Sequence, residues 1–425
     1  MKALSLLLAA LLAASASAAD LSSLAPEAPR IPSREFSAAT LGVKPDAGSP
    51  VTASLQAAVD HVAAAGGGKL VIPRGEYIVG PLRLASRLDL HLSAGAVLRL
   101  LPREQAFPAD ASRYASLLSA SGASDVRIGG PGRIDGQGEP WWRAYRAKEL
   151  TLRRPQLIQL EQCERVELSG FTSINPPNTH VALRLCREVT IRDVTLEAPD
   201  DSPNTDGLNL SGKNYLIERC RISTGDDNIV VLTHSAKGWT PPVCENFVIR
   251  DCALGFGHGL SIGSYTGGGI RGLLAERVTF DATTSGIRLK SDRDRGGLVE
   301  NLVYRDITMR GVKNPVFISS YYPKEPKSPD LDPARPVTDK TPRWKNILIE
   351  KLRATGSQNS FVLWGLPERP LENVTIRDAI IASERAAKFY HAGDLTATEV
   401  LLENNAAPAQ DFFPALPPAP IRPAR

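Results

Sequence analysis

The sequence lacks the features of a nucleic-acid-binding protein or an integral membrane protein. Its 50 lysines and arginines nearly balance 46 aspartates and glutamates, which leaves a net charge of +4 without a basic run. Nucleic acid is therefore not an expected partner. Beyond the N-terminus no apolar run is long enough to span a bilayer. An odd count of five cysteines, at low density, permits disulfides but does not indicate a disulfide-based scaffold.

The N-terminus has the pattern of a signal peptide. Lys2 is followed by an apolar stretch from Ala3 to Ala14 and by the small residues "ASA" before Ala19. This stretch is too short for a membrane span. We expect residues 1–19 to be removed, and the mature protein to be secreted or periplasmic, free of the membrane and monomeric.

Short strand-like segments recur along most of the chain. The segment "VTIRDVTL" (residues 189–196) alternates apolar residues, bends at two polar residues and alternates again. Related segments fit the same template at intervals that are mostly 23 to 32 residues. Their third positions are Leu168, Ile191, Ile217, Ile249, Ala275, Tyr304, Ile349 and Ile376.

A repeat of this length occurs in helical solenoids, propellers and parallel β-helices. The sequence shows none of the 3.6-residue apolar stripes of helical repeats, and propeller blades need about four strands in ~40–50 residues. We therefore predict an all-β fold, a right-handed parallel β-helix with three stacked sheets, in a single domain of residues 20–405. A helix from Leu55 to about Ala65 is expected to cap its open end. Residues 321–344 are predicted to be a Pro-rich surface insertion, and residues 406–425 a Pro-rich tail.

Three polar, glycine-flanked clusters precede short apolar strands: "NTDG", "GDDN" and "GHGLSIGS". When the repeats are aligned on the following strand, Asp206, Asp227 and His258 fall in one column of successive turns, and Asp226 lies one residue before it. Three carboxylates in one patch repel one another, so at least one is expected to hold its proton. A glycosidase uses such a set, because one carboxyl protonates the leaving oxygen and another activates water.

Strand alternation predicts which way the side chains of this column point. On the next turn Arg288 and Lys290 have the parity opposite to Ile287 and Leu289, so both cations should face outward and suit an anionic sugar such as a uronate. The same rule would turn Asp206 inward, unless the glycine corner breaks the alternation there.

The clusters "NTDG", "GDD", "GHGLSIGS" and "IRLK", in this order, resemble the signature motifs of the polygalacturonase family of pectin-degrading glycoside hydrolases. The resemblance implies a right-handed parallel β-helix and hydrolysis of α-1,4-galacturonan, an acidic polysaccharide, with inversion. By motif matching, Asp226 is the expected general acid, and Asp206 and Asp227 are expected to position and activate water. His258 is expected to support the protonation of the acid.

The resemblance also implies a substrate-binding set. Arg288 and Lys290 are expected to bind a galacturonate carboxylate, with Asn204 and either Tyr321 or Tyr322 completing the set. The sequence departs from the family at Asn228, where members often have a cysteine, which puts the usual local disulfide in doubt.

Other functions remain open at this point. The enzyme alternatives are a hydrolase of rhamnogalacturonan or of a substituted galacturonan and, less favoured, a pectate lyase; an inactive carbohydrate-binding β-helix is a non-enzyme alternative. A lyase would use Ca²⁺ and a basic residue. We expect no cofactor and no metal, because the acidic run "LEAPDDSPNTD" lacks the spacing of a calcium loop.

The cysteines are predicted to be structural. Cys220 and Cys252 occupy the template position that Phe171 and Val194 hold in other repeats, so both should be reduced and buried in a core column. Cys163, Cys186 and Cys244 share a second column just before a strand, and register alone does not establish a bond between any two of them.

Overall fold

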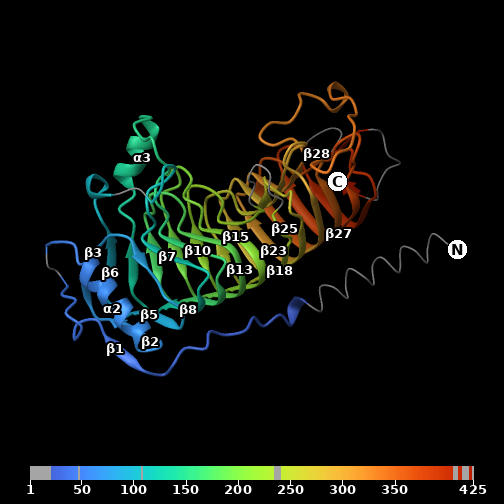
Figure 1. Ribbon diagram of the computed structural model, residues 1–425. Helices are drawn as coiled ribbons and strands as arrows, with labels where there is room; N and C mark the ends of the chain where they lie inside the picture. Colours follow the sequence, from blue (N-terminus) through green and yellow to red (C-terminus); the bar gives the residue numbers. More distant parts are fainter. Residues whose placement is uncertain are drawn as a thin grey trace. The chain divides into compact units, whose positions relative to one another are not determined.

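The computed structural model describes residues 21–45, 48–106, 109–233, 241–404, 410–413 and 421–423 (Figure 1). The predicted signal peptide, residues 1–19, lies outside the described residues. The chain divides into two compact units, which are described separately. The N-terminal unit is Ala25–Ile229, and the C-terminal unit is Val230–Arg425 together with Met1–Leu24. The short strand β17 (Ile229–Val231) contains the boundary.

In its described residues the N-terminal unit consists of strands and two α-helices. Its helical elements are α2 (Thr52–Ala64), η1 (Arg103–Gln105) and α3 (Glu139–Arg146). Its strands are β1 (Glu35–Ser37), β2 (Gly68–Ile72), β3 (Gly75–Val79), β4 (Leu82–Arg83), β5 (Leu88–Leu92), β6 (Ala96–Leu100), β7 (Leu118–Ser121), β8 (Ser124–Gly129), β9 (Arg133–Asp135), β10 (Ile158–Glu161), β11 (Glu164–Ser169), β12 (Thr172–Ile174), β13 (Val181–Arg192), β14 (Thr195–Glu197), β15 (Leu208–Glu218) and β16 (Arg221–Ser223).

These strands form three parallel ladders, one on each side of the coil. One ladder runs through β2, β5, β8, β11, β13 and β15. A second runs through β3, β6, β9, β12, β14 and β16. The third joins β4, β7 and β10 to the first half of β13, which shifts register between Leu183 and Cys186 before it continues in the first ladder. Each turn of the coil therefore adds one strand to each ladder.

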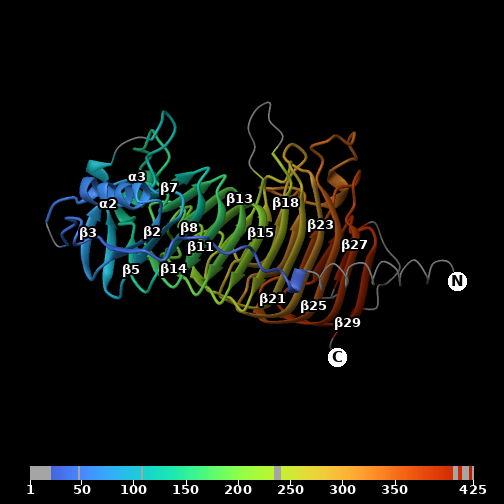
Figure 2. The same cartoon turned by 60° about the horizontal axis from the view of Figure 1, so that its bottom comes forward.

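Helix α2 covers the first turn of this coil, as predicted (Figure 2). Leu55, Ala58, Val59 and Val62 follow the spacing of one helix face, and all are buried. The helix packs on β2, β4 and β5. Burying this stripe removes apolar surface from water and shields strand edges that would otherwise be open to pairing with another chain.

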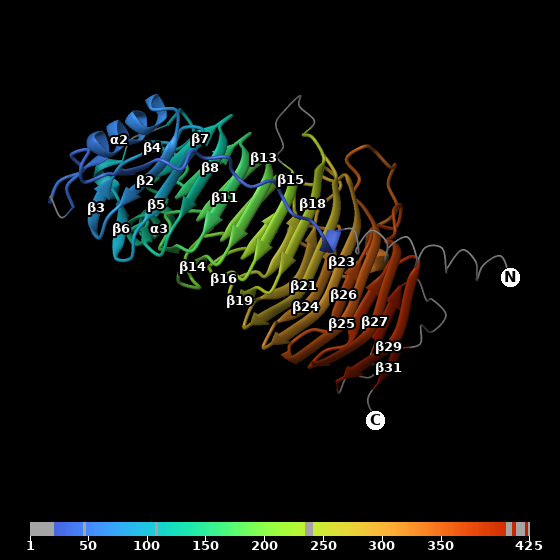
Figure 3. The same ribbon diagram turned by 90° about the horizontal axis from the view of Figure 1, so that it is seen from below.

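The C-terminal unit is also a stack of parallel strands (Figure 3). Its described residues include one short 3₁₀ helix, η2 (Pro329–Leu331). The strands after β17 are β18 (Cys244–Arg250), β19 (Ala253–Leu254), β20 (Leu260–Gly263), β21 (Ile270–Asp281), β22 (Ser285–Lys290), β23 (Leu298–Arg310), β24 (Asn314–Ser319), β25 (Arg343–Ser357), β26 (Phe361–Trp364), β27 (Glu372–Ser383), β28 (Ala387–Tyr390), β29 (Leu395–Glu403), β30 (Gln410–Phe413) and β31 (Ile421–Pro423).

Two ladders organise this unit. The long strands β18, β21, β23, β25, β27, β29 and β31 pair in sequence. The short strands β20, β22, β24, β26, β28 and β30 do the same. Both units are thus parallel β-helices, and the prediction of an all-β, right-handed parallel β-helix with an N-terminal capping helix is confirmed.

The register of the repeat is the one that the sequence predicts. In the N-terminal unit Leu168 pairs with Ile191, and Ile191 pairs with Ile217. In the C-terminal unit the corresponding chain of partners is Ile249, Ala275, Tyr304, Ile349 and Ile376. All of these residues are fully buried. The template therefore marks one inward column of the core in each unit.

The cysteines belong to the core. All five lie in the described part of the chain, all are buried, and none is in a disulfide. Cys220 and Cys252 are 1% and 2% exposed, and Phe171 and Val194 are each 1% exposed, so the predicted core column is confirmed. Cys163 follows β10 and Cys186 lies on the next turn. A hydrogen bond with the Cys186 thiol lowers the pKa of Cys163 to about 7.

Two segments depart from the regular coil. Residues 320–342, between β24 and β25, hold only the short helix η2 and mostly exposed side chains, which agrees with the predicted insertion. Beyond the predicted domain end at residue 405, β30 pairs with β28 and β31 pairs with β29, so part of the predicted tail is paired to the coil. The single domain of residues 20–405 stays a prediction. Within the described ranges no helix combines the length and the apolar character needed to cross a bilayer.

Candidate active site

The predicted site residues fall into two sets, one in each unit. In the N-terminal unit, Asp206 lies just before β15, and Asp226 and Asp227 lie between β16 and β17. Hydrogen bonds join the two turns that carry them. The Gly207 amide donates to the Asp227 carbonyl at 2.9 Å, and the Gly225 amide donates to Thr205 Oγ1 at 3.0 Å. The three carboxylates are therefore held on adjacent, directly linked turns.

The glycines of these two motifs are required by close backbone approach. A Cβ atom at Gly207 would lie 2.5 Å from the Asn228 carbonyl oxygen, and one at Gly225 would lie 2.1 Å from that of Ser202. Neither distance is compatible with a side chain, and in both cases the obstructing atom is backbone. The glycines thus bring the two turns within hydrogen-bond distance of each other.

Asp206 does not turn into the core. Leu208 and Leu210 are fully buried, whereas Asn209 lies on the opposite face of β15 and is partly exposed. The Asn209 amide donates to Asp206 Oδ2 at 3.0 Å, which places the carboxylate on the outer face. The glycine corner breaks the strand alternation, as the sequence argument required.

Asp226 and Asp227 are neighbours in space as well as in sequence. One carboxylate oxygen of Asp226 lies within 4.8 Å of one of Asp227. Asp226 is partly exposed; its Oδ1 accepts the Asp227 amide at 2.9 Å and its Oδ2 accepts the Asn204 side-chain amide at 3.3 Å. Asp227 is only 5% exposed. Two carboxylates this close repel when both are ionised, a cost that a purely structural turn would not need.

In the C-terminal unit, His258 lies between β19 and β20 and is partly exposed. Gly257 and Gly259 flank it with φ angles of 119° and 73°. A Cβ at Gly259 would lie 2.0 Å from the Ser285 carbonyl oxygen, and the Thr284 amide donates to the Gly257 carbonyl at 2.7 Å. The two glycines therefore dock the histidine turn onto the strand that leads to Arg288 and Lys290.

Arg288 and Lys290 lie on one face of β22, as predicted. The intervening Ile287 and Leu289 are fully buried in the core. Arg288 pairs in register with Ser261 and is partly exposed, and Lys290 pairs with Gly263. Lys290 is only 5% exposed, which is deeper than the expected outward position. A neighbouring loop accounts for this burial, because Lys290 Nζ lies 5.4 Å from the centroid of the Tyr322 ring.

Comparison with known proteins decides the family. Residues 65–406 match the model of "Glycosyl hydrolases family 28". The chain belongs to this family. It is 30% identical over 346 residues to a probable polygalacturonase of Vitis vinifera, covering 76% of this chain and 68% of that protein. It is 29% identical over 363 residues to an endo-polygalacturonase of Pectobacterium carotovorum, covering 79% and 85% of the two chains.

Solved structures show the same fold. An exopolygalacturonase from Thermotoga maritima matches with a TM-score of 0.80 at 24% identity, covering 92% of this chain and 96% of that one. A polygalacturonase from Erwinia carotovora matches with a TM-score of 0.68 at 22% identity, covering 95% and 100%. The chain is thus a polygalacturonase-like glycoside hydrolase of family 28 with the parallel β-helix fold.

At Asn228 this family 28 chain closes the turn of Asp226 and Asp227 with hydrogen bonds and without a disulfide. Asn228 is fully buried. Its side-chain amide donates to the Ile222 carbonyl at 3.1 Å and to Thr224 Oγ1 at 3.4 Å, and its own carbonyl accepts the Leu208 amide at 3.0 Å. The residue that departs from the family motif thus ties the aspartate turn to the strands on both sides.

The two candidate tyrosines differ in their surroundings. Tyr321 is 8% exposed, its hydroxyl donates to Asp332 Oδ2 at 2.8 Å, and burial together with this bond raises its pKa. Tyr322 is partly exposed and lies near Lys290, with the Arg295 guanidinium 5.8 Å from its ring centroid. The described structure therefore brings Tyr322, and not Tyr321, to the predicted substrate-binding lysine.

Sequence reasoning missed Arg154, which anchors the first aspartate turn. Arg154 is 5% exposed and donates to the carbonyls of Pro177 and Pro203 at 2.9 and 2.7 Å and to Asn204 Oδ1 at 2.8 Å. Burial lowers its pKa to about 10, against the opposing effects of Asp206 and other neighbours. Since Asn204 in turn donates to Asp226, the guanidinium fixes the amide that holds the predicted acid.

Helix α3 supplies a second anchor for the same turn. Its Arg146 donates to the carbonyl of Asp201 at 2.6 Å and pairs with the Asp201 carboxylate at 2.9 Å. The helix itself is fixed by Trp142, which is 5% exposed and donates to the Pro176 carbonyl at 2.9 Å. No sequence motif marks these contacts, because each joins residues more than 30 positions apart.

Proposed function

We propose that this family 28 enzyme hydrolyses the α-1,4-galacturonosyl linkages of galacturonan with an inverting acid–base mechanism. The observation that carries the proposal is the set of Asp206, Asp226 and Asp227 on two hydrogen-bonded turns. Its relatives include an endo-polygalacturonase and a probable polygalacturonase, which supports galacturonan as the substrate.

Each carboxylate receives a role that fits its environment. Asp226 is partly exposed and oriented by donors to both oxygens, so it can approach a substrate oxygen as the general acid. Asp206 and Asp227 are proposed to position and activate the water on the other side of the bond. Inverting enzymes usually hold acid and base carboxyls roughly 6.5–9.5 Å apart, with room for that water. An oxygen of Asp227 lies within 4.8 Å of one of Asp226, so this wider spacing is expected between Asp226 and Asp206. His258 is proposed to support the protonation of the acid, a role carried over from the family motif.

The substrate's charge is proposed to be recognised by the cations of β22. Arg288 offers a fork of donors that can hold a carboxylate in two parallel bonds, and Lys290 adds a nearly desolvated point charge. Tyr322 is the proposed neighbouring contact, and Asn204 the proposed contact on the aspartate side. The enzyme is proposed to be exported after removal of residues 1–19 and to act as a monomer without a cofactor.

The first test measures kcat of a variant in which the proposed acid is replaced by its amide. Purified Asp226→Asn should keep its fold, because an amide oxygen can still accept the Asp227 amide, and should lose roughly 10²–10⁴-fold or more in kcat on polygalacturonate. Turnover near that of the wild type in a folded variant would remove Asp226 from the role. Circular dichroism of both proteins provides the check on folding.

The products distinguish the competing chemistries. Proton NMR of the first product from the wild type should show the inverted anomer. A retained anomer contradicts the mechanism, and absorbance from unsaturated ends that disappears with EDTA identifies a lyase. Faster release of reducing ends from rhamnogalacturonan than from polygalacturonate would instead favour that substrate.

A further inference from the structure

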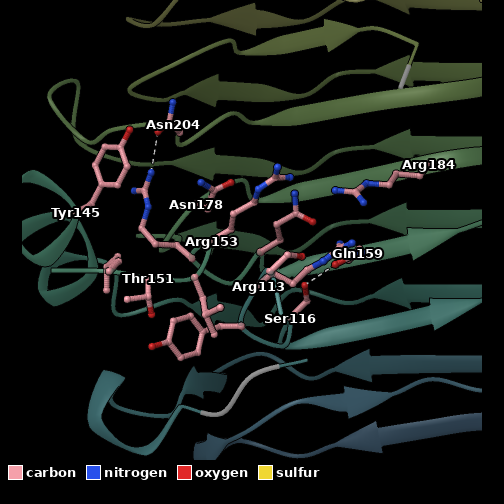
Figure 4. A pocket seen from close by; sticks show the side chains of 15 residues that line it. Arg113, Ser116, Tyr145, Thr151, Arg153, Gln159, Asn178, Arg184 and Asn204 are labelled. Carbon is pink, nitrogen blue, oxygen red and sulfur yellow. Dashed lines mark hydrogen bonds between the residues drawn. The ribbon is translucent and has the colours of Figure 1, made fainter. Parts of the chain in front are cut away.

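A cavity of about 630 Å³ opens beside the first aspartate turn, within the N-terminal unit (Figure 4). Three segments far apart in sequence build it: residues 112–116 before β7, residues 150–156 between α3 and β10, and the outer faces of β10 and β13. Its volume is in the range that accommodates a small ligand. Asn204 also lines it, so the cavity adjoins the residue that donates to Asp226.

Several arginine side chains line the cavity, and no carboxylate lines it among the described residues. Arg113 and Arg153 are direct partners in an isolated parallel bridge, so their side chains leave the backbone next to each other. Arg184 comes from β13 and points toward Arg153 in Figure 4. No aspartate or glutamate is among the described residues that line the cavity.

Among the described residues, two of these arginines form no salt bridge. Arg113 pairs with Asp110 at 3.3 Å, at the outer edge. Within the described ranges Arg153 and Arg184 take part in no salt bridge, and Arg184 Nε is buried without a hydrogen-bond partner. Burial first, and then the charge of Arg113, lowers the pKa of Arg184. Glu161 offsets this only in part. A part-buried guanidinium beside two other arginines is unfavourable for the fold, and an arriving anion would relieve this cost.

The other lining groups fit a sugar. Tyr145 is 46% exposed, and its ring lies against the Arg154 guanidinium at 4.1 Å. An exposed aromatic ring packs against the apolar face of a sugar, and the amides of Gln159 and Asn178 can bond with hydroxyl groups. Paired guanidinium forks match the planar carboxylate of a uronate better than a neutral sugar or an ammonium group.

We propose that this arginine cavity is a distal subsite that binds the carboxylate of a galacturonate unit remote from the cleaved bond. The inference rests on the proposed function, because it places one further uronate of the same polymer beside the catalytic turns. A neighbouring cavity of about 480 Å³ shares Arg113 and Gln159 but also contains Asp110 and Glu161. Its carboxylates repel a polyuronate, so the subsite ends at the arginines.

The experiment compares a long and a short substrate. The double variant Arg153→Gln/Arg184→Gln removes both unpaired guanidiniums, and Arg133→Gln is the control, since Arg133 is an exposed arginine on β9, outside this cavity. Activity is measured as release of reducing ends from polygalacturonate and from the shortest oligogalacturonate that the wild type cleaves.

We expect the double variant to lose at least ~10-fold in kcat/KM on polygalacturonate and to stay within about twofold of the wild type on the short oligomer. The loss should shrink as ionic strength rises, because salt screens the attraction. The control should match the wild type on both substrates.

Three results overturn the inference in distinguishable ways. Equal losses on both substrates would show that the arginines act through the catalytic turns and not at a distal subsite. Unchanged kinetics of the double variant, with an active wild type, would refute the subsite and leave the proposed function intact. A folded wild type that cleaves neither substrate would refute the proposed function and the subsite with it.

Discussion

His180 lies directly beneath the first aspartate turn and should limit the stability of the fold in acid. It is fully buried, and its backbone amide donates to the Asp206 carbonyl at 2.9 Å. Its Nδ1 shares a 2.8 Å hydrogen bond with Ser173 Oγ, and its Nε2 is buried without a partner. A protonated imidazole carries an N–H donor on each ring nitrogen, and this site offers an acceptor for only one of them.

Burial therefore lowers the pKa of His180 from 6.5 to about 3. Above pH 6.5 the ring is neutral in both the folded and the unfolded chain, so the full stability is present. As the pH falls below 6.5 the unfolded chain takes up a proton that the folded chain does not, and stability is lost until about pH 3. At 1.36 kcal/mol per pKa unit, the loss is about 2 kcal/mol at about pH 5 and about 5 kcal/mol in full.

The test is urea unfolding of the wild type and of His180→Asn between about pH 7.5 and about pH 5. Asparagine keeps a polar atom near Nδ1 for Ser173 but cannot be protonated. The variant should be less stable at neutral pH, because it leaves a cavity, and its disadvantage should shrink by about 2 kcal/mol toward pH 5. His61→Asn, at an exposed position on α2, is the matched control.

Two outcomes would refute the reasoning. Stability curves for the wild type and His180→Asn that stay parallel over this range would mean that the buried ring does not resist protonation. A histidine NMR signal assigned to position 180 that titrates near 6.5 would lead to the same conclusion. Because the proposed acid–base mechanism favours acidic conditions, the measurement also tells whether activity in acid is limited by chemistry or by unfolding.

Two further predictions concern the site itself. Lys290→Met keeps most of the side-chain length but deletes the charge, so kcat/KM on polygalacturonate should fall at least ~10-fold, or ~1.4 kcal/mol, and the loss on methyl-esterified pectin should be smaller. Equal losses on both polymers would show that Lys290 does not bind carboxylates. Arg154→Met leaves the Pro177 and Pro203 carbonyls and the Asn204 amide oxygen without their buried donor. The free energy of unfolding should therefore fall by roughly 2–5 kcal/mol, and kcat should fall by a larger factor than KM rises. Unchanged kcat in a destabilised Arg154 variant would limit this arginine to the fold.

The sequence predicted the coil because each turn repeats the same physical requirement. An inward residue must be apolar and must match the residues above and below it, so Ile191 and Ile217, or Ile349 and Ile376, recur at the same template position. The aspartate turns were predictable for a similar reason. Their glycines mark places where two backbones come too close for a Cβ, as Gly225 shows.

The anchors of the site were not predictable, because they do not repeat. Arg154 reaches across 50 residues to Asn204 from an irregular segment, and nothing distinguishes it in the sequence from the adjacent Arg153, which points into the arginine cavity. The depth of Lys290 and the difference between Tyr321 and Tyr322 depend on how the insertion after β24 folds back. The alternation of side chains along a strand predicts which face a residue lies on, but it does not predict which loop covers that face.

Asn228, where the sequence departs from the family motif, holds the aspartate turn with hydrogen bonds from a buried amide. A disulfide at this position would fix the aspartate turn covalently, but only in an oxidising compartment. The buried amide of Asn228 closes this turn with hydrogen bonds to Ile222 and Thr224, and all five cysteines of the chain are buried and outside any disulfide. Hydrogen bonds of a buried amide do not respond to redox potential. Hydrogen bonds and packing therefore hold the turn of Asp226 and Asp227, and its geometry does not depend on the redox state of the surroundings.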